Sequence, residues 1–298
     1  MRKRVAYIQF PQEETGMVKR LNGLNVRFTV SIYTQSGMPA SSKIDIYNPD
    51  REDLSFLTTT TRTANQKNYL FQLFGGYSDD VRLLFSGQVF EAIPSSYPDV
   101  IMSIRGNSNT KWWGDPFNIK KEKIKVMDLI DEAAKQMGYQ VNIDDNLRKT
   151  NRLLNMTQDN FSFTGSPLQL LEQAQEIMGG ISADPETVFL SVYNEQINIW
   201  SPSVQSNMVR VLEINKDTGM LGLPRPTGSG CEVDILMNTG IQTGDVVEIR
   251  SERIKILNGK YYVVKITHSG ELRGREWKTT LGCISINNFK ANENEITK

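Results

Sequence analysis

Residues 259–283 read GKYYVVKITHSGELRGREWKTTLGC, and they decide the fold because two strand-forming runs stand on either side of a glycine-containing turn. The run WKTTLGCISI has the period of two that is typical of β-strands, and KYYVVKI is rich in the aromatic and β-branched residues that strands favour. The segment SGELRGREW between them is polar and contains two glycines, as a chain reversal requires. We therefore predict an antiparallel hairpin, with Trp277, Thr279, Leu281 and Cys283 on one face of its second strand.

The residues before this hairpin contain similar turn signals. Prolines and glycines at 224–230 precede a short apolar alternation, and Gly240 and Gly244 bracket a turn before DVVEIRS. Asn258–Gly259 separates RIKIL from KYYVVKI, and an Asn-Gly pair suits a two-residue type I′ hairpin turn. Residues 224–283 thus predict a small antiparallel barrel or sandwich of about five strands.

The N-terminal part is also predicted to be an antiparallel β-domain. VRFTVSI at 26–32 alternates strictly, and KIDIYN, NYLFQLF, VRLLFSGQVFEAI and DVIMSIRG follow at short intervals. Gly87 interrupts the longest of these runs, which predicts a bulge or a sharp bend that lets one ribbon wrap round a barrel. The threonine-rich run 58–63 is expected to be an exposed strand or a linker.

The middle of the chain has a helical period instead. Apolar residues recur at i, i+3, i+4 and i+7 from Val126, and Gly138 stands where a left-handed cap belongs, which predicts a helix at 126–137. A second helix is predicted at 167–178, with Ser166 as its N-cap and Gln169 completing a capping box. Strands are expected around both helices, with Asn194–Glu195 forming a hairpin turn between the last two.

Two segments of the chain resemble the baseplate hub proteins of contractile-tailed bacteriophages. The first is FGGYSDDVRLLFSGQVFEAIP at 74–94, and the second runs from TGIQTGDVVEIRS at 239–251 into the hairpin. In the hairpin the order and spacing of nine residues carry the resemblance: Gly259, Tyr261, Val263, Ile266, His268, Gly270, Gly274, Trp277 and Thr279. The middle of the chain is similar to such hubs in architecture only.

This resemblance implies a mostly-β α+β fold with two antiparallel, tail-tube-like β-barrel domains at 1–106 and 207–290. Small α/β modules at 107–206 would lie between them, and a polar tail at 291–298 would follow. The resemblance also implies a homotrimer whose six barrels form a pseudo-sixfold ring, which joins the sixfold tail tube to the threefold central spike. Tape measure protein and DNA would pass through its channel without specific binding, and baseplate wedge proteins would contact it in the virion.

Composition argues against several other classes of function. Lys plus Arg and Asp plus Glu number 34 each, so no overall positive field attracts nucleic acid or anionic lipid. No apolar run reaches the roughly 18 residues that a membrane helix needs. The N-terminal MRKRVAYIQF has too few apolar residues for the apolar region of a signal peptide. Synthesis in the host cytoplasm is expected, and Cys231 and Cys283 are expected to be buried thiols rather than a disulfide.

Residues suited to catalysis or metal binding are scarce. His268 is the one histidine, and its HSGE context predicts a structural hydrogen bond rather than a catalytic triad. The carboxylate pairs at 13–14, 79–80 and 144–145 are expected in solvated turns, because adjacent acids diverge instead of facing each other across a sugar. We therefore predict that the protein is not an enzyme and that it uses no cofactor and no metal.

One aromatic segment is the candidate binding site. KWWGDPF at 111–117 places Trp112, Trp113 and Phe117 beside a lysine. Such side chains can stack on bases or sugars, but tryptophan is also enriched at protein interfaces. We predict that these three residues are interface anchors between domains or subunits.

Three other functions remain compatible with the sequence. A tail-tube or distal-tail protein would share the barrel fold but would carry one barrel per chain. A secretin-like ring component of an envelope machine is suggested by the strand–helix–two-strand unit near 167–199, although such units occur on unrelated folds. A tail-borne cell-wall hydrolase would need an acid and a base that meet in space.

Overall fold

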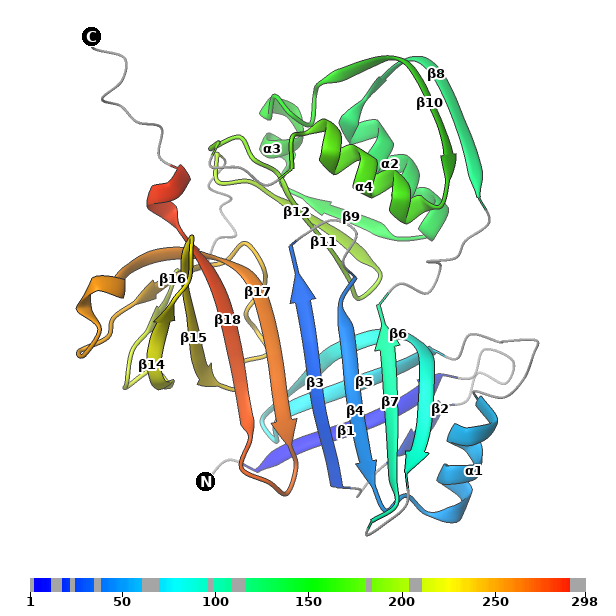
Figure 1. Ribbon diagram of the computed structural model, residues 1–298, viewed down its shortest axis with the longest axis vertical. Helices are drawn as coiled ribbons and strands as arrows, with labels where there is room; N and C mark the ends of the chain where they lie inside the picture. The colour runs from blue at the N-terminus through cyan, green and yellow to red at the C-terminus, as the bar shows by residue number, and fades with distance from the viewer. Residues whose placement is uncertain are drawn as a thin grey trace.

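A computed structural model describes residues 3–11, 18–21, 25–34, 39–60, 70–95, 99–108, 116–180, 184–203 and 211–289. Several sequence predictions therefore concern residues outside these ranges. They are the carboxylate pair at 13–14, the run 61–63, Trp112 and Trp113, and the polar tail at 291–298. The described part is an α+β fold that is mostly β, as predicted (Figure 1).

The N-terminal half of the chain supplies seven described strands and one helix. They are β1 (Arg4–Pro11), β2 (Val18–Leu21), β3 (Asn25–Tyr33), β4 (Ser41–Tyr47), α1 (Arg51–Thr60), β5 (Leu70–Tyr77), β6 (Asp80–Ser95) and β7 (Ile101–Asn107). Figure 1 shows β3, β4 and β7 side by side at the front, with β1 crossing behind them. The apolar faces of these strands enclose one core that contains Phe10, Phe28, Phe71 and Phe85.

The C-terminal part supplies the strands of the second β-unit. They are β13 (Val211–Ile214), β14 (Met220–Pro226), β15 (Gly230–Leu236), β16 (Val246–Ile249), β17 (Gly259–Glu271) and β18 (Trp277–Ser285), with short 3-10 helices η1 (Lys255–Leu257) and η2 (Ile286–Phe289). The predicted hairpin is confirmed, because β17 and β18 pair in antiparallel register from Tyr261–Ser285 to Gly270–Trp277.

The two β-units are joined into one open sheet. The strand order is β14-β15-β18-β17-β3-β4-β7-β6-β5-β1-β2, with β16 on β17 and β13 on β16. The first half of β17 pairs with β16, and its second half, from Lys265 to Glu271, pairs with β3. Because β17 carries on into the N-terminal sheet, the described C-terminal strands do not close on themselves. The sheets are therefore open, unlike the closed barrels that the sequence predicted.

The glycines and the tryptophan of the hairpin are explained by its contact with β3. The buried Trp277 ring packs edge-on against Phe28, with ring centroids 5.6 Å apart. A Cβ atom on Gly270 would lie 2.4 Å from Phe28 Cζ, closer than atoms can approach. Glycine at position 270 thus lets the two aromatic rings cover the hairpin backbone.

The predicted type I′ turn at 258–259 is wrong. Asn258 has φ −72° and ψ 133°, and residues 250–258 form a longer loop between β16 and β17 that contains η1. The Asn258 side chain is used to close this loop, since it bonds to both backbone groups of Ser251. The turn at Asn194–Glu195 does form, with positive φ at both residues.

Helix α1 replaces the strand or linker expected from Thr58 onward. Asp50 caps its first turn by accepting a 2.7 Å hydrogen bond from the Asp53 backbone N–H. The helix also buries Leu57 and places Phe56 against Phe10, with ring centroids 5.2 Å apart. Packing against the core thus outweighs the low helix propensity of a threonine run.

The bulge or bend predicted at Gly87 is found slightly later in the strand, as a register shift between Val89 and Glu91. Strand β6 pairs with β5 up to Gln88 and with β7 from Gln88 onward. A Cβ atom on Gly87 would lie 2.2 Å from the Asn107 carbonyl oxygen. The missing side chain allows β7 to approach where β6 changes partner.

A central α/β module lies between the two β-units in sequence. It contains β8 (Phe117–Lys125), α2 (Val126–Met137), β9 (Gln140–Ile143), α3 (Asp145–Thr150), β10 (Thr157–Gly165), α4 (Pro167–Ile177), β11 (Phe189–Tyr193) and β12 (Gln196–Trp200). Both predicted helices are confirmed with their caps: Gly138 is left-handed at φ 70°, and Ser166 forms a capping box with Gln169. Their apolar faces form a separate core with the β11-β12-β9 sheet.

The central module contacts both β-units. Ser108, just after β7, donates to the Val192 carbonyl at 3.0 Å, and its own carbonyl accepts from the Tyr139 hydroxyl at 3.1 Å. On the other side, the hydroxyls of Ser191 and Thr243 lie 3.2 Å apart. The module is thus fixed at the junction of the two halves of the large sheet.

Candidate functional site: assembly surfaces

His268 is part of the hairpin fold, as predicted. It lies in β17, is fully buried, and its Nδ1 lies 2.9 Å from the Thr279 hydroxyl on β18. Burial lowers the pKa of His268 to about 4 because the charged imidazolium would lose its hydration. The ring is therefore neutral at pH 7 and is held between strands, away from solvent.

The two cysteines are buried free thiols, also as predicted. Cys231 on β15 and Cys283 on β18 are register partners. The contact with Cys231 and burial raise the pKa of Cys283 well above its usual range. This pair is therefore a packed part of the C-terminal core.

Of the two described carboxylate pairs, the pair at 79–80 lies at a turn and the pair at 144–145 begins helix α3. Asp144 is the N-cap of α3 and accepts from the Asn146 and Leu147 backbone N–H groups. Asp80 forms a 2.7 Å ion pair with Arg82 two residues away. Among the residues within the described ranges, no group of three or more His, Cys, Asp or Glu side chains is placed to hold a metal ion.

Phe117 is the described member of the predicted aromatic anchor. It is half-buried at the start of β8 and contacts Phe163 on β10, with ring centroids 5.7 Å apart. Its ring packs against the core of the central module. Its role as an interface anchor stays a prediction, together with that of Trp112 and Trp113.

The large sheet has one face that points away from the core, and hydroxyl groups and paired charges cover it. We call this surface the polar face. Ser31 on β3 and Thr267 on β17 are register partners there, with hydroxyls 3.4 Å apart. Five cations on the polar face each lie within 4.0 Å of a carboxylate: Arg27 with Glu276, Lys43 with Asp45, Arg105 with Glu91, Lys278 with Asp234, and Arg225 with Glu232. These five cations are thus each neutralised by a nearby carboxylate, whereas Lys265 on the same face lies over the Tyr33 ring, 5.4 Å from its centre.

Asp234 is the centre of the strongest of these charge clusters. Burial alone would raise its pKa, but hydrogen bonds from Arg225, Thr280 and Lys278 together lower the pKa of Asp234 to about 2. The distances are 3.1 Å to Arg225, 2.6 Å to the Thr280 hydroxyl and 3.0 Å to Lys278 Nζ. The cluster links β14, β15 and β18 across the sheet. The sequence analysis gave no sign of this pairing, because it depends on the register between the three strands.

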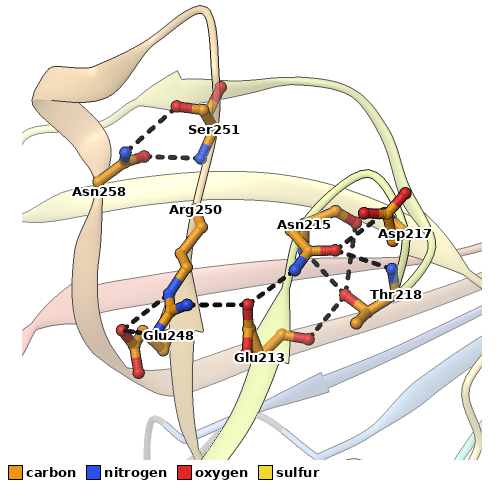
Figure 2. A network of polar contacts seen from close by, with 8 residues as sticks. All are labelled: Glu213, Asn215, Asp217, Thr218, Glu248, Arg250, Ser251 and Asn258. Atoms are coloured by element: carbon orange, nitrogen blue, oxygen red, sulfur yellow. Dashed lines mark hydrogen bonds and ion pairs between the residues drawn. The ribbon is translucent and has the colours of Figure 1, made fainter.

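The end of the C-terminal β-unit carries two braced loops, shown in Figure 2. In the first, Asn215 accepts from the Asp217 and Thr218 backbone N–H groups. In the second, residues 251–258, the Asn258 side chain bonds to the Ser251 backbone. An ion network joins the strands beneath them, since Arg250 lies 3.2 Å from Glu213 and 2.9 Å from Glu248.

A cleft of about 310 Å³ lies between the central module and the C-terminal β-unit. Its lining includes Asn142, Asn198 and Trp200 on one side and Gly244 and Tyr262 on the other. A Cβ atom on Gly244 would lie 2.8 Å from the Trp200 ring, so glycine permits the close approach of the two parts. Polar and apolar side chains both line this junction, since Val246, Tyr262 and Trp200 belong to a hydrophobic cluster there. Separately, no helix within the described ranges is both long and apolar enough to span a membrane.

Comparison with solved structures identifies the fold. A 43 kDa tail protein of prophage MuSo2 from Shewanella oneidensis matches with a TM-score of 0.60 at 10% identity, covering 97% of this chain and 98% of that one. A tail protein from Neisseria meningitidis matches with a TM-score of 0.60 at 8% identity, covering 96% and 98%. The E. coli c3393 protein, described as a component of the type VI secretion system, matches with a TM-score of 0.55 at 11% identity, covering 91% and 77%.

Sequence comparison identifies the family. A search of curated proteins finds no match. The family described as baseplate hub gp41, however, matches residues 22–283, which include both segments of the hub resemblance and the whole central module. This chain belongs to the baseplate hub gp41 family.

Proposed function

We propose that this protein forms a homotrimeric ring at the baseplate of a phage tail and that its role there is structural, without a catalytic step. The observation that carries the proposal is the pairing of β17 with β3, which makes one sheet from two β-units. Three such chains supply six β-units, so a threefold assembly can offer six similar positions. In this proposal, the N-terminal and C-terminal halves of the sheet correspond to the two tube-like domains of a hub protein.

This geometry suits an adaptor between parts of different symmetry. The six positions would face the sixfold tail tube, while the three chains would match the threefold central spike. The E. coli c3393 protein, which shares the fold, is described as similar to tail proteins gp27 and gp5 of bacteriophage T4. Wedge proteins of the baseplate would contact the outside of the ring in the virion.

We assign the polar face to the channel of this ring. Duplex DNA binds proteins mainly through unpaired cations that replace its counterions. On the polar face, cations such as Lys43 and Arg105 lie next to Asp45 and Glu91. Such a surface allows tape measure protein and DNA to slide past without being held.

The predicted domains at 1–106, 107–206 and 207–290 are the proposed units of this assembly. The first and third would form the ring wall, and the central module would project from it. Trp112, Trp113 and Phe117, near the start of the second unit, are proposed as anchors to a neighbouring unit or subunit.

Electron microscopy of the purified full-length protein tests the proposal. Averaged images are expected to show rings with threefold symmetry and six lobes. Rings with true sixfold symmetry and one lobe per chain would indicate a tail-tube or distal-tail protein. Sedimentation should give an assembly of three times 33.8 kDa, and any other closed stoichiometry would overturn the trimer.

A further inference from the structure

Most of the solvent-exposed large apolar side chains lie on unpaired edges of the large sheet. Val18 on β2, Val211 on β13, Leu223 on β14, and Phe90 and Ile93 on the second half of β6 are in this group. Each of these segments pairs on one side only within the described residues. Ile256 differs from them, since it lies on a loop and is 90% exposed.

The loop that carries Ile256 is braced from within, as Figure 2 shows for its ends. The Asn258 Oδ1 accepts from the Ser251 N–H at 2.6 Å, and Nδ2 donates to the Ser251 carbonyl at 3.2 Å. The Ser251 hydroxyl accepts from the Ile254 N–H at 3.1 Å, and Leu257 is buried beneath the loop. A loop whose backbone is held in this way loses little entropy on binding, which is the advantage of a preorganised contact.

The β6 edge offers an apolar patch of matching chemistry. The bulge between Val89 and Glu91 turns Phe90 outward, where it is 60% exposed, and Ile93 is 51% exposed. Glu91 lies on the same face and pairs with Arg105 at 3.1 Å. The loop is similarly apolar at its tip with charged neighbours, since Glu252, Arg253 and Lys255 are all exposed. Both surfaces thus have the apolar centre and polar rim of a protein contact.

The two surfaces lie on opposite flanks of the molecule. In Figure 1 the loop with η1, drawn in orange, is at the far left, whereas the β6–β7 edge is on the right. Two different patches on opposite flanks allow head-to-tail contact between copies, and such contact closes into a ring when the rotation between copies is right. A patch that met its own copy would instead produce a twofold dimer.

We propose that Ile256 of one copy packs against Phe90 and Ile93 of the next copy, and that this contact closes the ring. The inference rests on the ring of the proposed function and names the surfaces that join its subunits. Phe90 and Ile93 lie at the β6 edge of the polar face. The loop of the next copy would therefore contact the sheet at that edge.

Sedimentation velocity of three full-length variants tests the contact. Ile256→Asp and the double variant Phe90→Asp/Ile93→Asp should each convert the wild-type trimer to monomers. Leu223→Asp is the matched control, because Leu223 is 42% exposed on the β14 edge and should leave the trimer intact. Circular dichroism checks the fold, which exposed positions should not disturb.

Mixing the two defective proteins gives a second, independent readout. The Phe90→Asp/Ile93→Asp chain keeps its loop, and the Ile256→Asp chain keeps its patch, so one intact contact can form between them. A one-to-one heterodimer that does not close into a ring is expected. A twofold contact of one patch with its own copy would overturn the proposal, because only one of the two variants would then lose association and mixing would form no heterodimer.

The outcomes separate this contact from the proposed function. If both variants still form trimers, the proposed contact is overturned, but the proposed trimeric ring stands. A wild-type ring of another size that both variants dissolve would support the contact and overturn the trimer. A wild-type chain that is monomeric at all concentrations, or a variant defect seen only in binding a different protein, would overturn the contact.

Discussion

Arg4 in the first strand donates a 2.7 Å hydrogen bond to the carbonyl of Gly274 in the last hairpin turn. The same guanidinium reaches the Glu271 carbonyl at 3.3 Å and lies 5.5 Å from the centre of the Trp277 ring. The N-terminus of the chain thus fixes the tip of the C-terminal hairpin. The contact between the two β-units therefore includes a charged clamp as well as strand pairing.

Removing this clamp should weaken the protein. Arg4→Ala is expected to lower the free energy of unfolding by about 1–3 kcal/mol, since hydrogen bonds from charged groups are lost. Arg82→Ala is the control, because Arg82 makes its 2.7 Å ion pair with the nearby Asp80 at an exposed site and should cost under about 1 kcal/mol. Urea unfolding curves measure both, and equal losses would contradict the clamp.

Filling the space at Gly270 should also destabilise the fold. Gly270→Ala forces its new methyl group against Phe28 and Trp277, and overpacking of this kind costs about 1–3 kcal/mol. Gly228→Ala, where a Cβ meets nothing within 4 Å, should be neutral. Adding Phe28→Leu to Gly270→Ala should recover part of the loss, and a failure to recover any would argue against this explanation.

Acid should destabilise the protein through His268. The pKa of His268 is about 4 in the folded protein and about 6.5 in the unfolded chain. Between pH 6.5 and pH 4 the unfolded chain therefore binds a proton on His268, whereas the folded protein does not. Stability is therefore lost as the pH falls from about 6.5 to about 4, by about 3 kcal/mol in total. Asp234 titrates lower, near 2 to 3.8. Unfolding of His268→Leu should lack this part of the pH dependence, and an unchanged profile would contradict it.

The paired charges of the polar face should prevent DNA binding. The wild-type protein is expected not to retain duplex DNA at physiological salt. Asp45→Asn, Glu91→Gln and Glu276→Gln together free Lys43, Arg105 and Arg27, and should create binding with a logarithmic salt slope of up to about −3. The control is Glu132→Gln with Glu172→Gln and Glu176→Gln on the helices, which changes the net charge equally. If both triple variants bound DNA equally, then DNA binding would depend on the total charge and not on the polar face.

The two thiols should be unreactive until the chain unfolds. Cys231 and Cys283 are both buried, so a reagent reaches neither sulfur while the chain is folded. A chromogenic disulfide reagent should find no thiol in the native protein and two after denaturation. Rapid reaction of the native protein would contradict the packing described for β15 and β18.

The sequence predicted the elements whose signals are local. The helix from Val126 and the helix from Ser166 have their caps and apolar stripes within a dozen residues, and the β17–β18 hairpin has its turn between its strands. Helix α1 was missed because burial of Leu57 against distant strands, rather than propensity, stabilises it. The Asn258–Gly259 turn was misjudged because the Asn258 side chain bonds to Ser251, seven residues away.

The assembly surfaces depended on contacts that no local pattern reveals. The ion pairs of Lys43 and Arg105 depend on the fold, because Arg105 meets Glu91 only through the register between β6 and β7. Phe90 reads as a core residue in the run VRLLFSGQVFEAI, and only the bulge turns it to solvent. The open sheet follows from the length of β17, whose second half reaches a strand over 200 residues earlier in the chain.

The shared strand β17 also determines how the protein bears load. A force that pulls the two β-units apart acts on the seven register pairs of β17 and β3, from Lys265–Tyr33 to Glu271–Arg27, which form one ladder. Strands loaded parallel to their length must break such a ladder all at once, whereas a flexible linker would simply extend. The two β-units are therefore coupled by a strand ladder rather than by a linker, and a pull along these strands must shear that ladder.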